Sequence, residues 1–143
     1  MTRVLFLCTH NSCRSQLAEA LANHLWGDRI QAASAGTAPT SVHLRVLQVL
    51  QELGIDTAGL RSKGLEAFID RSSGQEFDYA ITLCANAERS CPTVFGKVKR
   101  VHIGFPDPSG ATGTEEERLA VFRRLRDEIK ERLGAFFKQE GVL

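Results

Sequence analysis

The sequence predicts an α/β fold, a four-stranded parallel sheet flanked by helices on both faces. Four short apolar runs, at residues 4–8, 30–37, 77–84 and 98–105, have the length of buried strands. Segments with helical apolar spacing separate these runs, as in βαβ units. The chain has 143 residues, 43% hydrophobic and 24% charged, so we expect one domain spanning residues 1–143.

The first two helices are predicted from apolar residues spaced three or four apart. After the first strand, Leu17, Leu21 and Leu25 form one apolar stripe, so we expect a helix that begins near residue 12. The second helix is expected to begin after a cap at Thr40 or Ser41 and to stop at a glycine, residue 54.

Two further helices complete the pattern. A short helix is expected after Ser62, and the turn-forming segment RSSGQ ends it. In the last helix, Thr114 and Glu117 have the spacing of a capping box, and apolar residues between 119 and 133 lie on one face. In an open parallel sheet the loops after the strands share one edge, so residues far apart in sequence are expected to meet there.

Composition argues against nucleic acid and membrane partners. The 18 Lys and Arg residues nearly balance the 17 Asp and Glu residues, and the net charge of +1 creates no strong field for polyanions. The apolar run in MTRVLFLC is too short for a signal peptide, and no segment approaches the about 20 apolar residues of a membrane span. We therefore expect a cytoplasmic protein, in which four cysteines favour thiol chemistry or metal binding over structural disulfides.

The loop CTHNSCRS, at residues 8–15, has the composition of an oxyanion site. It joins a strand to a helix, so its amides and the helix N-terminus can hold a tetrahedral anion. The same groups would stabilise a thiolate at Cys8, helped by a hydrogen bond from Ser15. Alternatively, Cys8 closes a strand as a small apolar residue and Arg14 is solvated. The predicted oxyanion-binding residues are Thr9, His10, Asn11, Ser12, Cys13 and Arg14.

Other loops supply a candidate acid and further thiols. Asp107, between two prolines, can protonate a leaving oxygen, although Asp-Pro is also common turn chemistry. Cys84 and Cys91 are seven residues apart, wider than the usual zinc spacing, so metal binding is a minor alternative to core packing or a redox pair. If the segment between them is helical, the two sites lie roughly 10 Å apart, so forming a disulfide requires a change of shape. Cys13 is either a loop-filling residue or an accessory thiol.

Several segments together resemble a known family. In order along nearly the whole chain they are VLFLCTHNSCRSQLAEAL, SAGT, ELGID, FDYAITLC, CP, DPSGATGTEEE and FRRLRDEI. With these segments the chain resembles the thioredoxin-coupled arsenate reductases of the low-molecular-weight protein tyrosine phosphatase superfamily. The resemblance implies a flavodoxin-like topology of the four-stranded sheet.

The resemblance also implies a three-cysteine relay. Cys8 would attack arsenate held by Arg14 and the loop amides, with Asp107 assisting loss of the leaving hydroxide. Cys84 would then form a disulfide with Cys8 and release arsenite. Cys91 would attack Cys84, so that a disulfide between Cys84 and Cys91 forms and Cys8 is restored. Thioredoxin would reduce the resulting disulfide, although a glutaredoxin with a small thiol stays open as the reductant. No bound cofactor is expected, and a monomer is the default.

Some members of this family bind potassium through an Asn, a Glu and a Ser. These match Asn11, Glu19 and Ser34, but the acidic residue that completes the site falls where this chain has RSK, at residues 61–63. No metal site is therefore included in the prediction, and potassium binding near these residues stays open.

Two other functions compete with arsenate reduction. A protein tyrosine phosphatase needs only Cys8, Arg14, Ser15 and Asp107, but phosphatases of this superfamily resemble one another in having tyrosines after the Asp-Pro pair. Here Ser109 and a glycine follow, which leaves no aromatic wall for a phosphotyrosine. The non-enzymatic alternative is a thiolate protein that binds a metal or metalloid.

Overall fold

The computed structural model describes residues 1–66, 77–84 and 98–143. Its four strands are β1 (Thr2–Cys8), β2 (Ile30–Gly36), β3 (Tyr79–Thr82) and β4 (Lys99–His102). They form one sheet in the order β2-β1-β3-β4, and every neighbouring pair is parallel. This confirms the predicted α/β class and the flavodoxin-like strand order.

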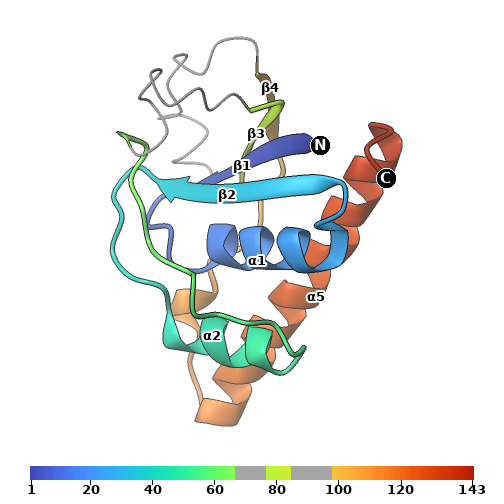
Figure 1. Cartoon of the computed structure of the whole chain (residues 1–143). Coiled ribbons are helices and arrows are strands. Elements are labelled where there is room, and N and C mark those ends of the chain that lie inside the picture. The colour runs from blue at the N-terminus through green and yellow to red at the C-terminus, as the bar shows by residue number, and fades with distance from the viewer. Residues whose placement is uncertain (67–76, 85–97) are drawn as a thin grey trace.

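Three helices and one short 3₁₀ turn are described. The helices are α1 (Arg14–Trp26), α2 (Leu44–Gln51) and α5 (Glu115–Gln139), and the 3₁₀ turn, η3, spans Pro108–Gly110. Figure 1 shows α1, α2 and α5 together on one side of the sheet. No helix in the described segments is both long enough and apolar enough to cross a membrane.

The central strand β1 has apolar side chains on both faces. Val4 and Phe6 pack in the cluster that includes the buried side chains of the three helices, such as Phe122. Leu5 and Leu7, one residue out of phase, pack in a second cluster on the opposite face. Burial on both faces explains the continuous apolar run, which is typical of parallel sheets. The short helix expected after residue 62 falls mainly on residues 67–76, outside the described residues.

Element ends depart from the sequence prediction in places. The second helix begins at Leu44 and not after Thr40 or Ser41, because the ring nitrogen Nδ1 of His43 accepts from the Arg45 N–H at 3.1 Å and caps the helix. Strand β3 ends at Thr82, so the expectation that it extends to Cys84 is wrong. The predicted capping box of the last helix is confirmed, with reciprocal bonds between Thr114 and Glu117.

Candidate active site

The loop after β1 is held from outside by residues 37–43, through four backbone hydrogen bonds. These run from the N–H groups of Thr37, Ala38, Thr40 and His43 to the carbonyls of Cys8, Thr9, His10 and Ser12, at 3.3, 2.8, 3.1 and 3.1 Å respectively. Because N–H and C=O point in opposite directions in a trans peptide, the following N–H groups face the other side of the loop. No acceptor within the described residues takes up the N–H groups of residues 9–13, so these can bind an anion.

Close backbone approach shapes this loop. Asn11 has a φ of 50°, the left-handed conformation that asparagine tolerates better than most residues. Beside it, Gly36 leaves no room for a side chain, since a Cβ would lie 2.6 Å from the Thr9 carbonyl oxygen and 2.8 Å from the Asn11 nitrogen. The glycine of the SAGT segment therefore lets β2 approach the anion loop.

A buried hydrogen bond reaches the sulfur of Cys8. The hydroxyl of Ser15 lies 3.0 Å from Cys8 Sγ, and Asn11 Nδ2 donates to the same hydroxyl at 2.7 Å. An amide NH₂ group can only donate, so the Ser15 hydroxyl accepts from Asn11 and has its own proton free for the sulfur. Cys8 and Ser15 are therefore placed as the sequence predicted.

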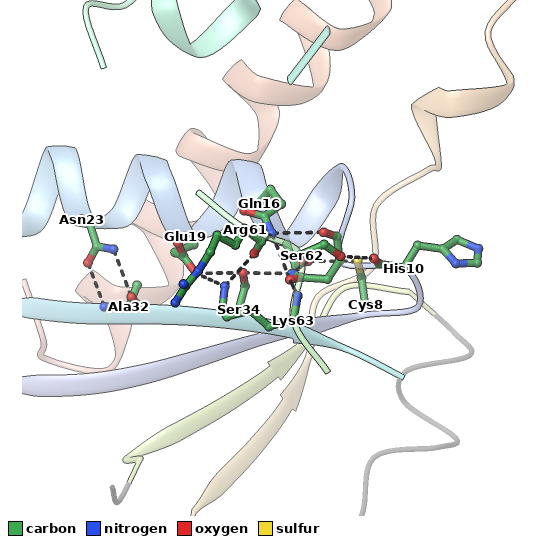
Figure 2. A network of polar contacts seen from close by, with 12 residues as sticks. Cys8, His10, Gln16, Glu19, Asn23, Ala32, Ser34, Arg61, Ser62 and Lys63 are labelled. Carbon is green, nitrogen blue, oxygen red and sulfur yellow. Dashed lines mark hydrogen bonds and ion pairs between the residues drawn. The ribbon is translucent and has the colours of Figure 1, made fainter. Parts of the chain in front are cut away.

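The hydrogen bonds continue from Asn11 along α1 and β2 (Figure 2). Asn11 Nδ2 also donates to Ser34 Oγ at 2.9 Å, and Ser34 Oγ donates to Glu19 Oε1 at 2.8 Å. On the other side of the amide, Asn11 Oδ1 accepts from the Lys63 N–H at 2.8 Å and from Gln16 Nε2 at 2.9 Å. The orientation of the Asn11 side chain is thereby fixed from both ends.

These residues do not fit a potassium ion. Lys63 Nζ lies 3.5 Å from Glu19 Oε1 and donates to the Arg61 carbonyl at 2.9 Å. A side-chain cation thus already contacts the carboxylate that a metal would need, and the oxygen of Asn11 is occupied by N–H donors. In the described segments, no group of three His, Cys, Asp or Glu side chains could hold a metal ion.

Arg14 projects from the first turn of α1 towards the loop before η3. Its NH1 group donates to the Phe105 carbonyl at 3.2 Å, and its NH2 group lies 3.8 Å from Asp107 Oδ2. Its Nε–H is buried and has no acceptor among the described residues. A hydrogen bond and an ion pair hold the guanidinium in place, and its Nε–H is left for an oxyanion.

Asp107 is exposed beside this guanidinium, with 50% of its side-chain surface accessible. Burial raises the pKa of Asp107, but hydrogen bonds from the N–H and hydroxyl of Ser109, together with the Arg14 charge, lower it by more. The net pKa lies below the ordinary value, so the carboxyl is ionised at neutral pH in the free protein. An oxyanion placed next to it would oppose that charge and favour protonation.

A pocket of about 220 Å³ brings these groups together. The residues that line it are Cys8, His10, Ser12, Cys13, Arg14, Thr40, Asp107 and Ser109. The predicted nucleophile, the predicted anion-binding arginine and the predicted acid therefore open into one space.

The second thiol lies next to the first loop. Cys84 Sγ is 3.1 Å from the hydroxyl of Thr9, the residue that follows Cys8. Cys8 and Cys84 also belong to one cluster of buried residues on the same face of the sheet, and both are free thiols. Cys91 and the predicted change of shape around it lie outside the described residues.

Cys13 is a buried thiol that also lines the pocket. Burial raises its pKa to about 11, more than the neighbouring Ser12 hydroxyl lowers it. It therefore stays protonated at neutral pH, and its sulfur is a poor nucleophile. This favours the loop-filling interpretation over the accessory thiol.

Several contacts of the site had no signal in the sequence. The backbone of residues 37–43 holds the loop, and the Phe105 carbonyl holds Arg14. The Lys63 backbone and side chain reach Asn11 and Glu19. Backbone groups look alike in every residue, so only the arrangement of the chain reveals these contacts.

Comparison with known proteins places the chain in a family. The family model described as low molecular weight phosphotyrosine protein phosphatase matches residues 3–141. An arsenate reductase of Halalkalibacterium halodurans is 42% identical over 133 residues, which are 93% of each chain. The arsenate reductase of Bacillus subtilis is likewise 42% identical over 133 residues, again 93% of each chain.

Solved structures of arsenate reductases share the fold. One in a phosphate-binding state superimposes with a TM-score of 0.78 at 31% identity and covers 97% of this chain and 98% of its own. A thioredoxin-dependent arsenate reductase of Corynebacterium glutamicum has a TM-score of 0.61 at 29% identity, over 92% of this chain and 61% of its own. This chain therefore belongs to the low molecular weight phosphotyrosine protein phosphatase family, whose arsenate reductases share its fold.

Proposed function

We propose that this protein is an enzyme that reduces arsenate to arsenite by a relay of three cysteines. The observation that carries the proposal is the placement of two thiols at one oxyanion loop. Cys8 Sγ lies 3.0 Å from the Ser15 hydroxyl within the loop, and Cys84 contacts the side chain of the next residue, Thr9, at 3.1 Å. A phosphatase has no use for a second thiol there. A reductase needs one, because the two electrons given to arsenic leave a disulfide between two cysteines.

The first step forms a bond between sulfur and arsenic. Arsenate is bound by the free N–H groups of residues 9–13 and by Arg14, whose Nε–H has no other acceptor within the described residues. The thiolate of Cys8 attacks arsenic, and the bond from arsenic to one hydroxyl oxygen breaks. Asp107, protonated when the anion is bound, gives its proton to that oxygen, which leaves as water.

The second and third steps move the oxidation away from Cys8. The thiolate of Cys84 attacks Cys8 Sγ, a disulfide forms, and the electron pair of the sulfur–arsenic bond stays on arsenic, which leaves as arsenite. The thiolate of Cys91 then attacks Cys84 Sγ. A disulfide between Cys84 and Cys91 forms, and Cys8 is released as a thiolate.

The disulfide between Cys84 and Cys91 must be reduced by a dithiol from outside, and we propose thioredoxin in a reducing cytoplasm. The thioredoxin-dependent relative from Corynebacterium glutamicum supports this choice. A glutaredoxin with a small thiol is the other possible donor. All the thiols come from one chain, so a monomer suffices.

A coupled assay tests the proposal. Purified protein, thioredoxin, thioredoxin reductase and NADPH are mixed with arsenate, and NADPH oxidation is followed for wild type, Cys84→Ser and Cys91→Ser. Hydrolysis of p-nitrophenyl phosphate, which needs neither residue, reports whether each variant keeps an intact loop. We expect arsenate turnover in wild type only and phosphate ester hydrolysis in all three. Arsenate turnover that survives in both variants contradicts the relay.

Phosphatase activity is the second candidate, since the family description names it and Cys8, Arg14 and Asp107 share one pocket. Among the described residues that line this pocket, none is a phenylalanine, tyrosine or tryptophan. We therefore expect slow hydrolysis of small aryl phosphates and poor activity on phosphotyrosine peptides.

The Asp107→Asn variant tests the alternative of a non-enzymatic thiolate protein. Asp107→Asn removes the proton donor and leaves the loop amides in place, so arsenate should still protect Cys8 from alkylation while turnover falls by about 100-fold or more. Unchanged arsenate consumption in this variant would remove Asp107 from the reaction.

A further inference from the structure

We propose that Lys63 is a built-in counter-cation for Glu19, and that this pair positions the charge and hydrogen bonds on which the Cys8 thiolate depends. The pair touches neither the pocket that contains Cys8 nor the sulfur, so both are positioning residues. The inference rests on Cys8 being the nucleophile, as proposed above, but it does not require arsenate to be the substrate.

A continuous line of hydrogen bonds joins Glu19 to Cys8, as Figure 2 shows in part. Ser34 Oγ donates to Glu19 Oε1 at 2.8 Å, and Asn11 Nδ2 donates to Ser34 Oγ at 2.9 Å. The same Nδ2 donates to Ser15 Oγ at 2.7 Å, and that hydroxyl lies 3.0 Å from Cys8 Sγ. Asn11, Ser15 and Ser34 have no solvent exposure, so water cannot replace these bonds.

The direction of each bond in this line follows when Cys8 is a thiolate, which can only accept. Asn11 Oδ1 accepts from the Lys63 N–H and from Gln16, so its NH₂ group must face the two serines. Since NH₂ only donates, both hydroxyls accept from it and turn their own protons outward. Ser34 donates to Glu19, and Ser15 donates to Cys8. One buried amide therefore serves two anions, the carboxylate and the thiolate.

Two negative charges on one network oppose each other unless one is compensated. The side chains of Glu19 and Lys63 are only 12% and 20% exposed, so water screens the carboxylate weakly. The Lys63 ammonium, 3.5 Å from Glu19 Oε1, supplies the compensation, and the Arg61 carbonyl holds it at 2.9 Å. With the pair neutral overall, the carboxylate can orient Ser34 without disfavouring the thiolate.

Glu19 is also reachable from a second pocket, distinct from the one that contains Cys8. Glu19 lines this pocket of about 370 Å³ together with Asn23, His24 and Asp56. A small cation therefore has a route to the carboxylate if the lysine side chain is shortened.

The test measures the pH dependence of Cys8 alkylation by iodoacetamide, with the peptide carrying Cys8 quantified by mass spectrometry. Lys63→Met should move the midpoint of the curve up, and Glu19→Gln should move it down, each by about 0.5 to 1 pH unit. The double variant and Lys63→Arg should stay close to wild type. Other charged or titratable groups around the two sites are kept in every variant: His10, Cys13, Arg14, His24, Asp56, Arg61, Cys84 and Asp107.

The two single variants distinguish charge compensation from a purely structural role. A structural role predicts slower alkylation in both, whereas compensation predicts opposite shifts. Shifts of the same sign, or none, would overturn the inference. If Lys63→Met does not fold, Lys63→Gln replaces it. The downward shift expected for Glu19→Gln also distinguishes charge compensation from a structural role. Because no arsenate is present, a failure of the proposed reaction does not affect this result.

Chemical rescue gives an independent readout. In Lys63→Ala, propylammonium chloride should restore the wild-type alkylation curve, because it replaces the missing part of the side chain. Choline chloride at the same ionic strength should not, because its head group is too bulky to approach Glu19. The wild-type curve should be the same in sodium and potassium chloride. Equal rescue by choline, or a wild-type response to potassium, would contradict a built-in cation.

Discussion

The hydroxyl oxygen of Ser15 lies 3.0 Å from the sulfur of Cys8, and the same oxygen accepts a hydrogen bond from Asn11 Nδ2. Because a thiolate only accepts, Ser15 donates its own proton to the sulfur when Cys8 is ionised. Cys8 and Ser15 are both buried, so a charged sulfur there depends on donors supplied by the protein.

Ser15→Ala should weaken the nucleophile. A hydrogen bond to a charged group contributes about 1.5 to 3 kcal/mol, so the rate of Cys8 alkylation at pH 7 should fall roughly 10- to 100-fold. Ser41→Ala, at an exposed position, is the matched control and should leave the rate unchanged. Equal alkylation of Ser15→Ala and wild type would show that the sulfur does not use this donor.

Gly36→Ala should damage the anion loop. The added Cβ would meet backbone atoms of Thr9 and Asn11 at 2.6 and 2.8 Å, and backbone cannot move aside as a flexible side chain can. We expect a loss of about 1 to 3 kcal/mol in the free energy of unfolding, together with weaker phosphate binding. Gly59→Ala, where no atom lies within 4 Å, should change neither quantity. Urea unfolding and phosphate titration check both; a stable Gly36→Ala that binds phosphate normally would contradict the close approach.

Thr9→Val should slow the second step more than the first. It removes the hydroxyl that lies 3.1 Å from Cys84 Sγ and keeps the size of the side chain. After rapid mixing with arsenate, the disulfide between Cys8 and Cys84 should form about 10-fold more slowly, while p-nitrophenyl phosphate hydrolysis changes little. Thr112→Val, at an exposed position, is the control. Equal slowing of both reactions would mean that Thr9 serves the loop as a whole.

Cys13 should make stability depend on alkaline pH. Burial raises its pKa from 9.0 to about 11 in the folded protein, so the folded state holds the proton after the unfolded chain has released it. The stabilisation is fully present below pH 9 and is lost as pH rises through about 11. The difference in free energy of unfolding between wild type and Cys13→Ala should shrink by about 2 kcal/mol between pH 8 and 11. The same difference at both pH values would contradict this.

The sequence predicted those parts of the fold that depend on local pattern. The apolar run of β1, the amphipathic α5 and its Thr114 cap were all recognisable, because burial and capping leave a periodic signal. The predicted start of α2 was wrong. The helix is capped by a ring nitrogen of His43, and histidine is not among the residues that usually cap helices.

For the site, the sequence predicted the reactive residues better than their supports. Cys8, Arg14 and Asp107 were expected at one edge of the sheet, and they line one pocket. The bond between Thr9 and Cys84 and the pairing of Lys63 with Glu19 were not foreseen. These depend on the path of the chain between distant segments, which residue types alone do not determine.

A single-turnover experiment tests the relay most directly. Reduced protein is mixed with excess arsenate in the absence of any reductant, quenched with an alkylating agent, and analysed for arsenite and for disulfide-linked peptides. We predict one arsenite per protein and a disulfide between Cys84 and Cys91 in wild type, and a trapped disulfide between Cys8 and Cys84 in Cys91→Ser. Four free thiols and no arsenite would contradict the proposed function.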